Sequence, residues 1–301
     1  MGTFLTRLDI LANCNLKTCP KTAILNSRAQ KAMRQQIDKW IVRSARIFRR
    51  GTPLAMGKLD EGVGAYIRTR SRLALQLLTK AAEARKIRRP ACSWDEIIDY
   101  SFNFADGFLR PLQVRSEIKQ ALETIERLQP TTIVEIGTAG GGNFFMLARA
   151  ASEDAKLVST DLPRGAYGGG YSAWKAPVFR RLLLSGQTAD FVRGDSHSPE
   201  TLDTVRSTLR GSPVDVLFID GDHSYEGVKK DFEIYSRLVR PDGLIFLHDI
   251  AEHPASRNCH VSRFWNELRL VTDAREFIEN PRQGWAGIGM VRAMQQDVQR
   301  P

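Results

Sequence analysis

Long hydrophobic runs are absent from this sequence. No apolar stretch approaches the roughly 20 residues that a membrane-spanning helix needs. The first residues, MGTFLTRLDILANCNLKTCPK, contain neither a charged segment followed by an apolar block nor a small-residue cleavage site. Both absences argue against a membrane or exported protein, and we expect a soluble protein of the cytoplasm. With 301 residues and 42% hydrophobic content, the chain can hold one large α/β domain and a smaller one.

Cysteine is also scarce. The four cysteines, Cys14, Cys19, Cys92 and Cys259, are scattered along the chain. Such thiols form a poor disulfide framework and fit a reducing compartment. Cys14 and Cys19 are spaced as C-x4-C, but a zinc site would need a second pair of ligands and none is nearby. We therefore expect ordinary thiols.

Acidic residues are scarce in the first third only. Residues 1–100 hold 20 Lys and Arg against 8 Asp and Glu, whereas the remaining residues hold 24 and 26. Residues 27–50 space apolar side chains three and four apart between basic ones, which predicts an amphipathic basic helix. Such a helix packs its apolar stripe on a neighbour, which we favour, or binds an anionic membrane surface or nucleic acid.

Further helices are predicted before the composition changes. A second helical pattern over residues 59–86 ends at Pro90, and Ser93 with Glu96 makes a capping box for another helix. The sequence thus predicts a basic helical region over residues 1–104, which could support a homo-oligomer, and an α/β domain over residues 105–301.

Short β-branched runs alternate with helical patterns from Pro111 onward. A helix is predicted over residues 113–128. Each predicted strand is followed by a polar or glycine turn and a helix, which indicates a doubly wound, mostly parallel sheet. Ligands of such sheets bind at the carboxyl ends of the strands. The predicted strands cover residues 131–137, 156–161, 189–195, 214–222 and 243–249.

A glycine-rich turn follows the first predicted strand in IVEIGTAGGG. Gly137, Gly140, Gly141 and Gly142 allow a tight turn and a close approach of a ligand to the helix N-terminus, or serve packing alone. A strict G-x-G-x-x-G is absent, which argues against a pyrophosphate-binding dehydrogenase.

Carboxylates close the first three predicted strands. Glu135 ends the first beside the glycines, Asp161 ends the second, and Asp195 ends the third. Any one of them could be a solvated loop carboxylate or a helix cap. Together they indicate a nucleoside cofactor, because a carboxylate at the end of the second strand can accept both ribose hydroxyls.

Four motifs in this order carry a family resemblance: VEIGTAGGG, STDLP, RGDSHS and DVLFIDGDHSYEGVKKDFEIYSRLVRPDGLIFLHDI. They resemble class I S-adenosylmethionine-dependent methyltransferases. Within that class the chain is similar to the metal-dependent O-methyltransferase branch that includes the cephalosporin-biosynthesis and macrolide-sugar enzymes. The resemblance covers about residues 105–292.

The resemblance implies a Rossmann-like, doubly wound sheet of seven strands with a reversed last strand, for which residues 284–293 are suited, preceded by a helical extension. It also implies S-adenosylmethionine as the cofactor. Its methionine side would be lined by Glu135, Gly137, Gly140 and Gly142, its ribose held by Asp161, and its adenine placed near Asp195.

Two acidic and imidazole clusters follow the fourth and fifth strands. FIDGDHSYEG contains Asp220, Asp222 and His223, and LHDI contains His248 and Asp249. Since these strand ends are neighbours in the implied sheet, the clusters converge beside the methyl donor, as a metal site that activates a hydroxyl requires.

The resemblance implies roles within these clusters. Asp220 and Asp249 would be metal ligands, His248 a third ligand, and His223 the general base. The relatives usually carry a carboxylate at position 248, and imidazole suits Mn²⁺, Fe²⁺ or Zn²⁺ better than Mg²⁺. We expect Mg²⁺ or Mn²⁺, and the sequence does not decide between them.

Structural roles are the alternatives for these side chains. Asp222 could cap the helix that begins near Tyr225, His248 could be a core histidine bonded to a backbone carbonyl, and His223 could be merely structural. The remaining histidines, His197, His253 and His260, are expected in loops without a catalytic part.

Aromatic residues gather in residues 163–181, a glycine-rich loop. Tyr167, Tyr171 and Trp174 have flat apolar faces of the kind that stack on sugar rings, so we expect a substrate lid with Tyr171 and Trp174 at the substrate. The alternative is an Ω-like loop packed on itself. Trp265 is expected on the core side of a helix.

The preferred function is metal-assisted O-methylation of a hydroxyl on a small molecule, sugar or glycan. A nucleic-acid (RNA) methyltransferase would use the basic helices, but D-G-D-H stands where such enzymes carry an Asn/Asp-Pro-Pro-aromatic motif. A non-haem iron oxygenase lacks its usual jelly-roll strand pattern here. A non-catalytic binding module would leave the site residues without a role.

Overall fold

The computed structural model describes residues 76–167 and 169–293. The chain divides into two compact units, Met1–Arg72 and Leu73–Pro301, and the described residues belong to the second. The predicted division at residue 104 falls inside this second unit. The basic helix over residues 27–50, Cys14, Cys19 and the expected role in oligomer formation lie outside the described residues.

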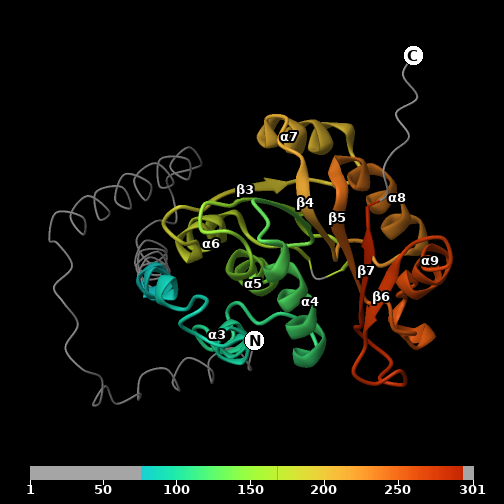
Figure 1. The fold of residues 1–301 in the computed structure, drawn as a ribbon, viewed down its shortest axis with the longest axis horizontal. Helices are drawn as coiled ribbons and strands as arrows, with labels where there is room; N and C mark the ends of the chain where they lie inside the picture. Colours follow the sequence, from blue (N-terminus) through green and yellow to red (C-terminus); the bar gives the residue numbers. More distant parts are fainter. Residues whose placement is uncertain (1–75, 168, 294–301) are drawn as a thin grey trace, which may run out of the picture. The chain divides into compact units, whose positions relative to one another are not determined.

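Seven strands form a single sheet in the order β3-β2-β1-β4-β5-β7-β6 (Figure 1). The first five run parallel, and β7 runs antiparallel to both β5 and β6. This arrangement confirms the predicted doubly wound sheet with a reversed last strand. The strands are β1 (Thr132–Ile136), β2 (Lys156–Asp161), β3 (Thr188–Arg193), β4 (Val214–Ile219), β5 (Val239–His248), β6 (Ala274–Phe277) and β7 (Ile288–Arg292).

Helices connect the strands, and three of the described α-helices begin at a serine whose side chain caps them. Ser93 and Glu96 form the predicted capping box, and Ser198 and Ser224 cap two further helices. Residues 76–83 are helical. The α-helices are α3 (Trp94–Asn103), α4 (Arg115–Leu128), α5 (Gly142–Ala150), α6 (Ala176–Leu182), α7 (Pro199–Leu209), α8 (Tyr225–Tyr235) and α9 (Val261–Leu268), and the short 3-10 turns are η2 (Ala84–Lys86), η3 (Ala173–Lys175), η4 (Ser236–Leu238) and η5 (Ala255–Arg257).

Alternation along the strands builds two hydrophobic layers. Successive side chains point to opposite faces, so Ile133 packs with α4, α5 and α6, whereas Val134 packs with α7, α8 and α9. Figure 1 shows these two groups of helices on opposite sides of the sheet. Trp265 is 1% exposed in the second layer, as expected. Both faces are therefore covered, and the strand ends are left for ligands.

Buried Arg149 ties the segment before α3 to the sheet domain. From α5, its guanidinium donates to the carbonyls of Ala84 (2.9 Å), Leu182 (2.7 Å) and Ile87. It also lies over the ring of Phe145. These bonds fasten residues 84–87 to α5 and to the end of α6.

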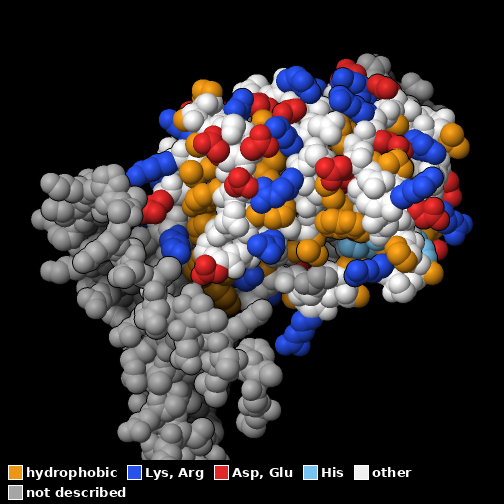
Figure 2. All heavy atoms as spheres, turned by 90° about the horizontal axis from the view of Figure 1, so that it is seen from below, with side chains coloured by type: hydrophobic (Ala, Val, Ile, Leu, Met, Phe, Trp, Pro, Cys, Tyr) orange, Lys and Arg blue, Asp and Glu red, His pale blue; other side chains and the backbone are white. Residues whose placement is uncertain are grey.

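No helix in the described part of the chain combines the length and apolar character that crossing a membrane requires. On the face seen in Figure 2, acidic and basic side chains are interspersed, and histidine side chains lie in a hollow bordered by hydrophobic ones.

Candidate active site

A cleft opens at the carboxyl ends of β1 to β4. Three residues predicted to bind the cofactor, Gly137, Asp161 and Asp195, line it together with Asp220 from the predicted metal site. Because these parallel strands end at one edge of the sheet, residues far apart in sequence meet in one cleft. Glu135, Gly140 and Gly142 are not among its lining residues.

Gly137 marks the closest approach of two strand ends. Its φ is +94°, and an added Cβ would lie 1.9 Å from the carbonyl oxygen of Asp220. Its amide also donates to Thr160 O across to β2. The absence of a side chain here therefore lets the ends of β1, β2 and β4 come together.

Gly142 serves packing rather than lining the cleft. A Cβ on this buried residue would lie 2.2 Å from the carbonyl oxygen of Leu109, and Ser101 Oγ donates to the Gly142 carbonyl. At Gly140 the corresponding Cβ would lie 3.2 Å from Leu109 O. Gly137 therefore leaves room at the cleft, whereas Gly142 leaves room for close packing against Leu109.

Glu135 lies beneath the glycine-rich turn with 1% of its surface exposed. Its carboxyl accepts hydrogen bonds from Asn143 Nδ2 (3.1 Å) and Ser159 Oγ (2.5 Å), and Ser159 also contacts Thr138 Oγ1 (2.6 Å). Burial raises the pKa of Glu135 to about 8 despite these bonds. In this structure its oxygens hold the strand end rather than face the cleft.

Asp161 connects the end of β2 to the glycine-rich turn. Its Oδ2 accepts a 2.6 Å bond from the Ala139 amide. Burial raises the pKa of this carboxyl, and the amides of Ala139 and Thr138 oppose the shift. A carboxylate at the cleft wall suits a pair of ribose hydroxyls.

Asp195 and His197 follow β3 at the cleft wall. Asp195 Oδ1 accepts a 2.9 Å bond from the His197 amide, and half of its side chain is exposed. The His197 ring lies 3.2 Å from Asp231, a carboxylate with no exposed surface. This contact raises the pKa of His197, which lies in the loop after β3, as expected.

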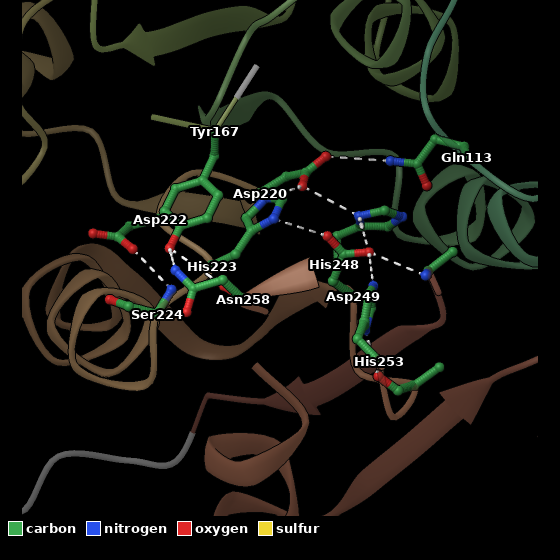
Figure 3. Close-up of polar contacts among 12 residues, drawn as sticks. Gln113, Tyr167, Asp220, Asp222, His223, Ser224, His248, Asp249, His253 and Asn258 are labelled. Carbon is green, nitrogen blue, oxygen red and sulfur yellow. Dashed lines mark hydrogen bonds and ion pairs between the residues drawn. The ribbon is translucent and has the colours of Figure 1, made fainter. Parts of the chain in front are cut away.

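The predicted metal ligands converge beside the cleft (Figure 3). His248 Nδ1 lies 3.2 Å from Asp220 Oδ1 and 3.4 Å from Asp249 Oδ1. Ligand atoms of the three residues all lie within 4.8 Å of one another. The three side chains therefore fit a single ion, because ligands about 2 to 2.4 Å from an ion are separated by such distances.

His223 lies against both carboxylates. Its Nε2 is 3.6 Å from Asp220 Oδ1, and its Nδ1 is 3.3 Å from Asp249 Oδ2. Its side chain is 26% exposed. The structure thus brings the predicted base to the predicted ligands.

The carboxylates of this cluster are held in their charged form. Burial would raise the pKa values of Asp220 and Asp249, but the charge of His248 and the hydrogen bonds from histidines outweigh it and lower both. Burial would lower the pKa of His223, yet Asp220, Cys259 and Asp249 raise it to about 10. The carboxylates also raise the pKa of His248 well above its usual value.

His248 is 4% exposed, and its Nδ1 faces carboxylates. The alternative of a core histidine bonded to a backbone carbonyl is not what these contacts show. Within the described residues, its buried Nε2 has no hydrogen-bond partner. The ring is thus aimed at the cluster.

Three residues outside the predicted set contact the two carboxylates. Gln113 Nε2 donates to Asp220 Oδ2 (3.4 Å). The Ala286 amide donates to Asp249 Oδ1 (3.1 Å), and His253 Nε2 lies 3.2 Å from the same oxygen. His253 therefore contacts a predicted metal ligand. Cys259 lies near His223 and Asp249. One potential ligand atom from each of these three residues lies within 4.8 Å of the other two.

Buried Glu117 positions the segment that carries Ala286. Its Oε1 accepts bonds from the Glu279 amide (2.9 Å) and Gln283 Nε2 (2.8 Å), and its Oε2 accepts one from the Gly287 amide (2.9 Å). Helix α4 thereby fixes the turn before β7. The sequence offers little signal for this role, since its partners lie more than 160 positions away.

The predicted lid reaches across the cleft through Tyr167. Its ring stacks on His223 with centroids 4.7 Å apart, and its hydroxyl lies 3.4 Å from Asn258 O. Trp174 is 37% exposed and its ring contacts Phe108. The substrate role of the loop stays a prediction.

Tyr171 differs from its predicted setting. It is 3% exposed and packs against the rings of Phe179 and Phe191 in the core. A ring that stacks on a sugar needs an open face, and Tyr171 has none in this structure. Its apolar surface is used by the neighbouring aromatic residues instead.

Asp222 stands just before α8 but is not its capping residue. Ser224 caps that helix by accepting from the Gly227 amide, and Asp222 Oδ1 accepts a 2.8 Å bond from the Ser224 amide. Asp222 therefore shapes the turn before the cap, and it lines the cleft as well.

The sheet order and the strand-end carboxylates are those expected of a class I methyltransferase domain. Residues 134–250 match the protein family described as "Methyltransferase domain". The match lies within the residues that carry the predicted resemblance, and these residues are similar to a methyltransferase domain.

Two curated relatives and several solved structures are similar to the chain. The uncharacterized protein y4gI of Sinorhizobium fredii (strain NBRC 101917 / NGR234) is 27% identical over 172 residues, which are 56% of this chain and 18% of that protein. The uncharacterized protein R132 of Acanthamoeba polyphaga mimivirus is 27% identical over 146 residues, 48% of this chain and 63% of that protein. The chain thus spans less than two thirds of either relative.

Among solved structures, the O-methyltransferase TomG from Streptomyces achromogenes, in complex with SAM, is 20% identical, with a TM-score of 0.44 over 73% of this chain and 90% of that chain. The O-methyltransferase from Bacillus cereus, in complex with SAH, is 18% identical, with a TM-score of 0.43 over 67% of this chain and 90% of that chain. Likenesses of this size leave the acceptor of this protein open.

Proposed function

We propose that this protein is an O-methyltransferase that transfers the methyl group of S-adenosylmethionine to a hydroxyl of a small molecule, sugar or glycan with the help of a divalent cation. One observation carries the proposal. Asp220 lines the same cleft as Gly137 and Asp161, and it also belongs to the ligand cluster with His248 and Asp249. A methyl donor and a cation-held hydroxyl would therefore lie side by side.

The cleft has the features that a nucleoside cofactor requires. Asp161 presents a carboxylate to the ribose, Asp195 lies at the adenine end, and Gly137 leaves the strand ends open to the sulfonium side. Glu135 and Gly142 support this wall from below, where they fix the glycine-rich turn. Their contribution to cofactor binding is therefore through position rather than contact.

The ligand cluster also fits a divalent cation. Two carboxylates and one imidazole offer hard and borderline donors, and the raised pKa values of His223 and His248 show how strongly this cluster favours positive charge. A bound cation would lower the pKa of the acceptor hydroxyl that it coordinates. The imidazole donor favours Mn²⁺ or another transition ion over Mg²⁺.

Different residues of the chain would bind the cation and accept the proton. Asp220, His248 and Asp249 would hold the cation, and Gln113 and the Ala286 amide fix the carboxylates. His223, stacked on Tyr167, would accept the hydroxyl proton at a ring nitrogen, because a cation bound to Asp220 and Asp249 would displace the proton that these carboxylates otherwise hold on the ring. The acceptor oxygen then attacks the methyl group in line with the leaving thioether.

Calorimetry tests the two halves of this proposal separately. S-adenosylmethionine and Mn²⁺ are titrated into the wild type, Asp161→Ala and Asp220→Ala, with Asp203→Ala on exposed α7 surface as the control. We expect Asp161→Ala to weaken cofactor binding about 100-fold, because hydrogen bonds to a charged group contribute about 1.5 to 3 kcal/mol each. Asp220→Ala should keep cofactor binding and lose the Mn²⁺ response.

Methyl transfer from labelled S-adenosylmethionine to panels of phenols, sugars and RNA identifies the acceptor class. Transfer to hydroxyl acceptors that requires Asp220 supports the proposal. Wild-type cofactor affinity in Asp161→Ala, or transfer to RNA alone, would overturn it.

A further inference from the structure

Cys259 belongs to a second group of ligand atoms beside the candidate active site. It is 8% exposed, and one ligand atom each from Cys259, His223 and Asp249 lie within 4.8 Å of one another. The proposed reaction gives this thiol no role.

The backbone around Cys259 is fastened to His223. The amide of His260 donates a 2.8 Å bond to the carbonyl of His223. On the other side of the thiol, Asn258 O lies 3.4 Å from the hydroxyl of Tyr167, whose ring stacks on His223. Contacts on both flanks thus set the position of the thiol.

Asp249 belongs to both groups of potential metal ligands, and its two oxygens face different neighbours (Figure 3). Its Oδ1 lies 3.4 Å from His248 Nδ1 and 3.2 Å from His253 Nε2. Its Oδ2 lies 3.3 Å from His223 Nδ1. The first set contains oxygen and nitrogen donors, whereas the second adds sulfur.

We propose that His223, Asp249 and Cys259 form a second cation site, which binds a thiophilic divalent ion of the zinc class through nitrogen, oxygen and sulfur. Three protein ligands of these types leave a fourth tetrahedral position for water. The thiol releases its proton to solvent as the ion binds. Mg²⁺ is excluded from such a set because thiolate is a soft donor.

Occupation of this second site has a consequence that rests on the proposed function. An ion bound to His223 withdraws its imidazole from proton transfer. Zinc is therefore an inhibitor of the reaction that Mn²⁺ supports, and Cys259 sets the sensitivity to it.

Cobalt reports directly on the thiolate, since a Co²⁺–thiolate bond gives a charge-transfer band in the near ultraviolet. The full chain is used with Cys14→Ser, Cys19→Ser and Cys92→Ser, which leaves Cys259 as the remaining thiol. We expect the band in this background, its loss on adding Cys259→Ser, and its persistence on adding Asp220→Ala instead.

Two results of the cobalt experiment would overturn the second cation site. No band in the background would overturn the site. Loss of the band with Asp220→Ala as well as with Cys259→Ser would also overturn it, because Cys259 would then share one ion with Asp220. Thermal unfolding without metal shows that each variant folds, and Cys259→Ala replaces the serine variant if that one does not.

Zinc inhibition is then compared with each variant's own rate in Mn²⁺. We expect Cys259→Ser to require at least about 10-fold more zinc, in line with the loss of one ligand interaction. Equal zinc sensitivity would overturn the regulatory part. Absence of the cobalt band in a protein that still binds S-adenosylmethionine and methylates a hydroxyl would refute the second site and leave the proposed function standing.

Discussion

The two halves of the cleft hold their carboxyl groups in opposite states. At the ends of β1 and β2, burial raises the pKa of Glu135 to about 8 and also raises that of Asp161. At the ends of β4 and β5, imidazoles overcome the effect of burial and lower the pKa values of Asp220 and Asp249. The first half thus limits its negative charge, whereas the second preserves it.

This difference matches what each half is proposed to bind. A nucleoside is recognised by hydrogen bonds, so the first half needs well-placed oxygens and a fixed backbone more than charge. A cation is recognised by charge, so the second half needs ionised carboxylates, and the histidines keep them ionised until the cation arrives. Gly137, whose backbone touches Asp220, lies where the halves meet.

The largest effect is expected where the halves meet. Gly137→Ala places a Cβ 1.9 Å from the Asp220 carbonyl at a φ of +94°, so the ends of β1 and β4 must separate. We expect a loss of about 3 kcal/mol or more in the free energy of unfolding. Cofactor and metal binding should both fail, as measured by urea unfolding and calorimetry.

Gly211→Ala is the matched control for this prediction. Its φ is +81°, but nothing lies within 4 Å of the added Cβ, so only the backbone cost of about 1 to 2 kcal/mol remains. Equal losses in the two variants would show that backbone strain, and not the contact between β1 and β4, explains Gly137.

A smaller effect, confined to the cation half, is expected from Glu117→Gln. The new amide group faces backbone N–H donors, which leaves at least one of them unpaired at a cost of about 1 to 3 kcal/mol. The turn that brings the Ala286 amide to Asp249 then loosens. Calorimetry should show Mn²⁺ affinity about 10-fold lower and unchanged cofactor affinity.

Glu123→Gln, on a partly exposed position of the same helix, controls for the loss of one negative charge. If cofactor affinity fell as much as metal affinity in Glu117→Gln, the two halves would not be separable in the way that the contacts indicate.

The smallest effect is expected from Glu135→Gln in the cofactor half at about pH 4, where the carboxyl is protonated in both the folded and the unfolded protein. Glutamine can accept from Asn143 and donate to Ser159, and the folded carboxyl is already largely protonated below its pKa of about 8. Because folding raises this pKa, its contribution to stability is complete below about pH 4.5 and is lost as the pH rises through about 8.

Unfolding by urea across pH 4 to 9 measures this contribution. The variant should lose less stability than the wild type as the pH rises, with the difference growing between about pH 4.5 and pH 8 and levelling off above that range. Parallel curves would mean that Glu135 is ionised in the folded protein and that the two halves do not differ in the proposed way.

Much of the fold followed from local patterns. The five parallel strands, the capping box at Ser93 and the final strand were predicted close to their observed positions, because short apolar runs and helix caps are encoded locally. Strand β6 was missed. Its four residues are partly exposed at the sheet edge and carry no hydrophobic run, and they are joined to the domain through β7 and the contact between Glu276 and Trp265.

The candidate site was predictable only in part. The predicted ligands meet because their strands are neighbours, which topology alone ensures. Their supports could not be predicted, since Gln113 precedes Asp220 by 107 positions and Tyr167 reaches Asn258 from 91 positions away. Tyr171 was misplaced for the same reason, because whether an aromatic ring faces solvent or core depends on what folds over it.

By itself, the sequence determined which chemical groups stand at the strand ends, because parallel strands deliver their last residues to one edge of the sheet. The tertiary structure alone decided which carboxyl groups remain charged and which atoms share a ligand. Proton affinity and coordination depend on burial and on neighbours within a few ångströms, and those neighbours come from segments that local patterns do not connect.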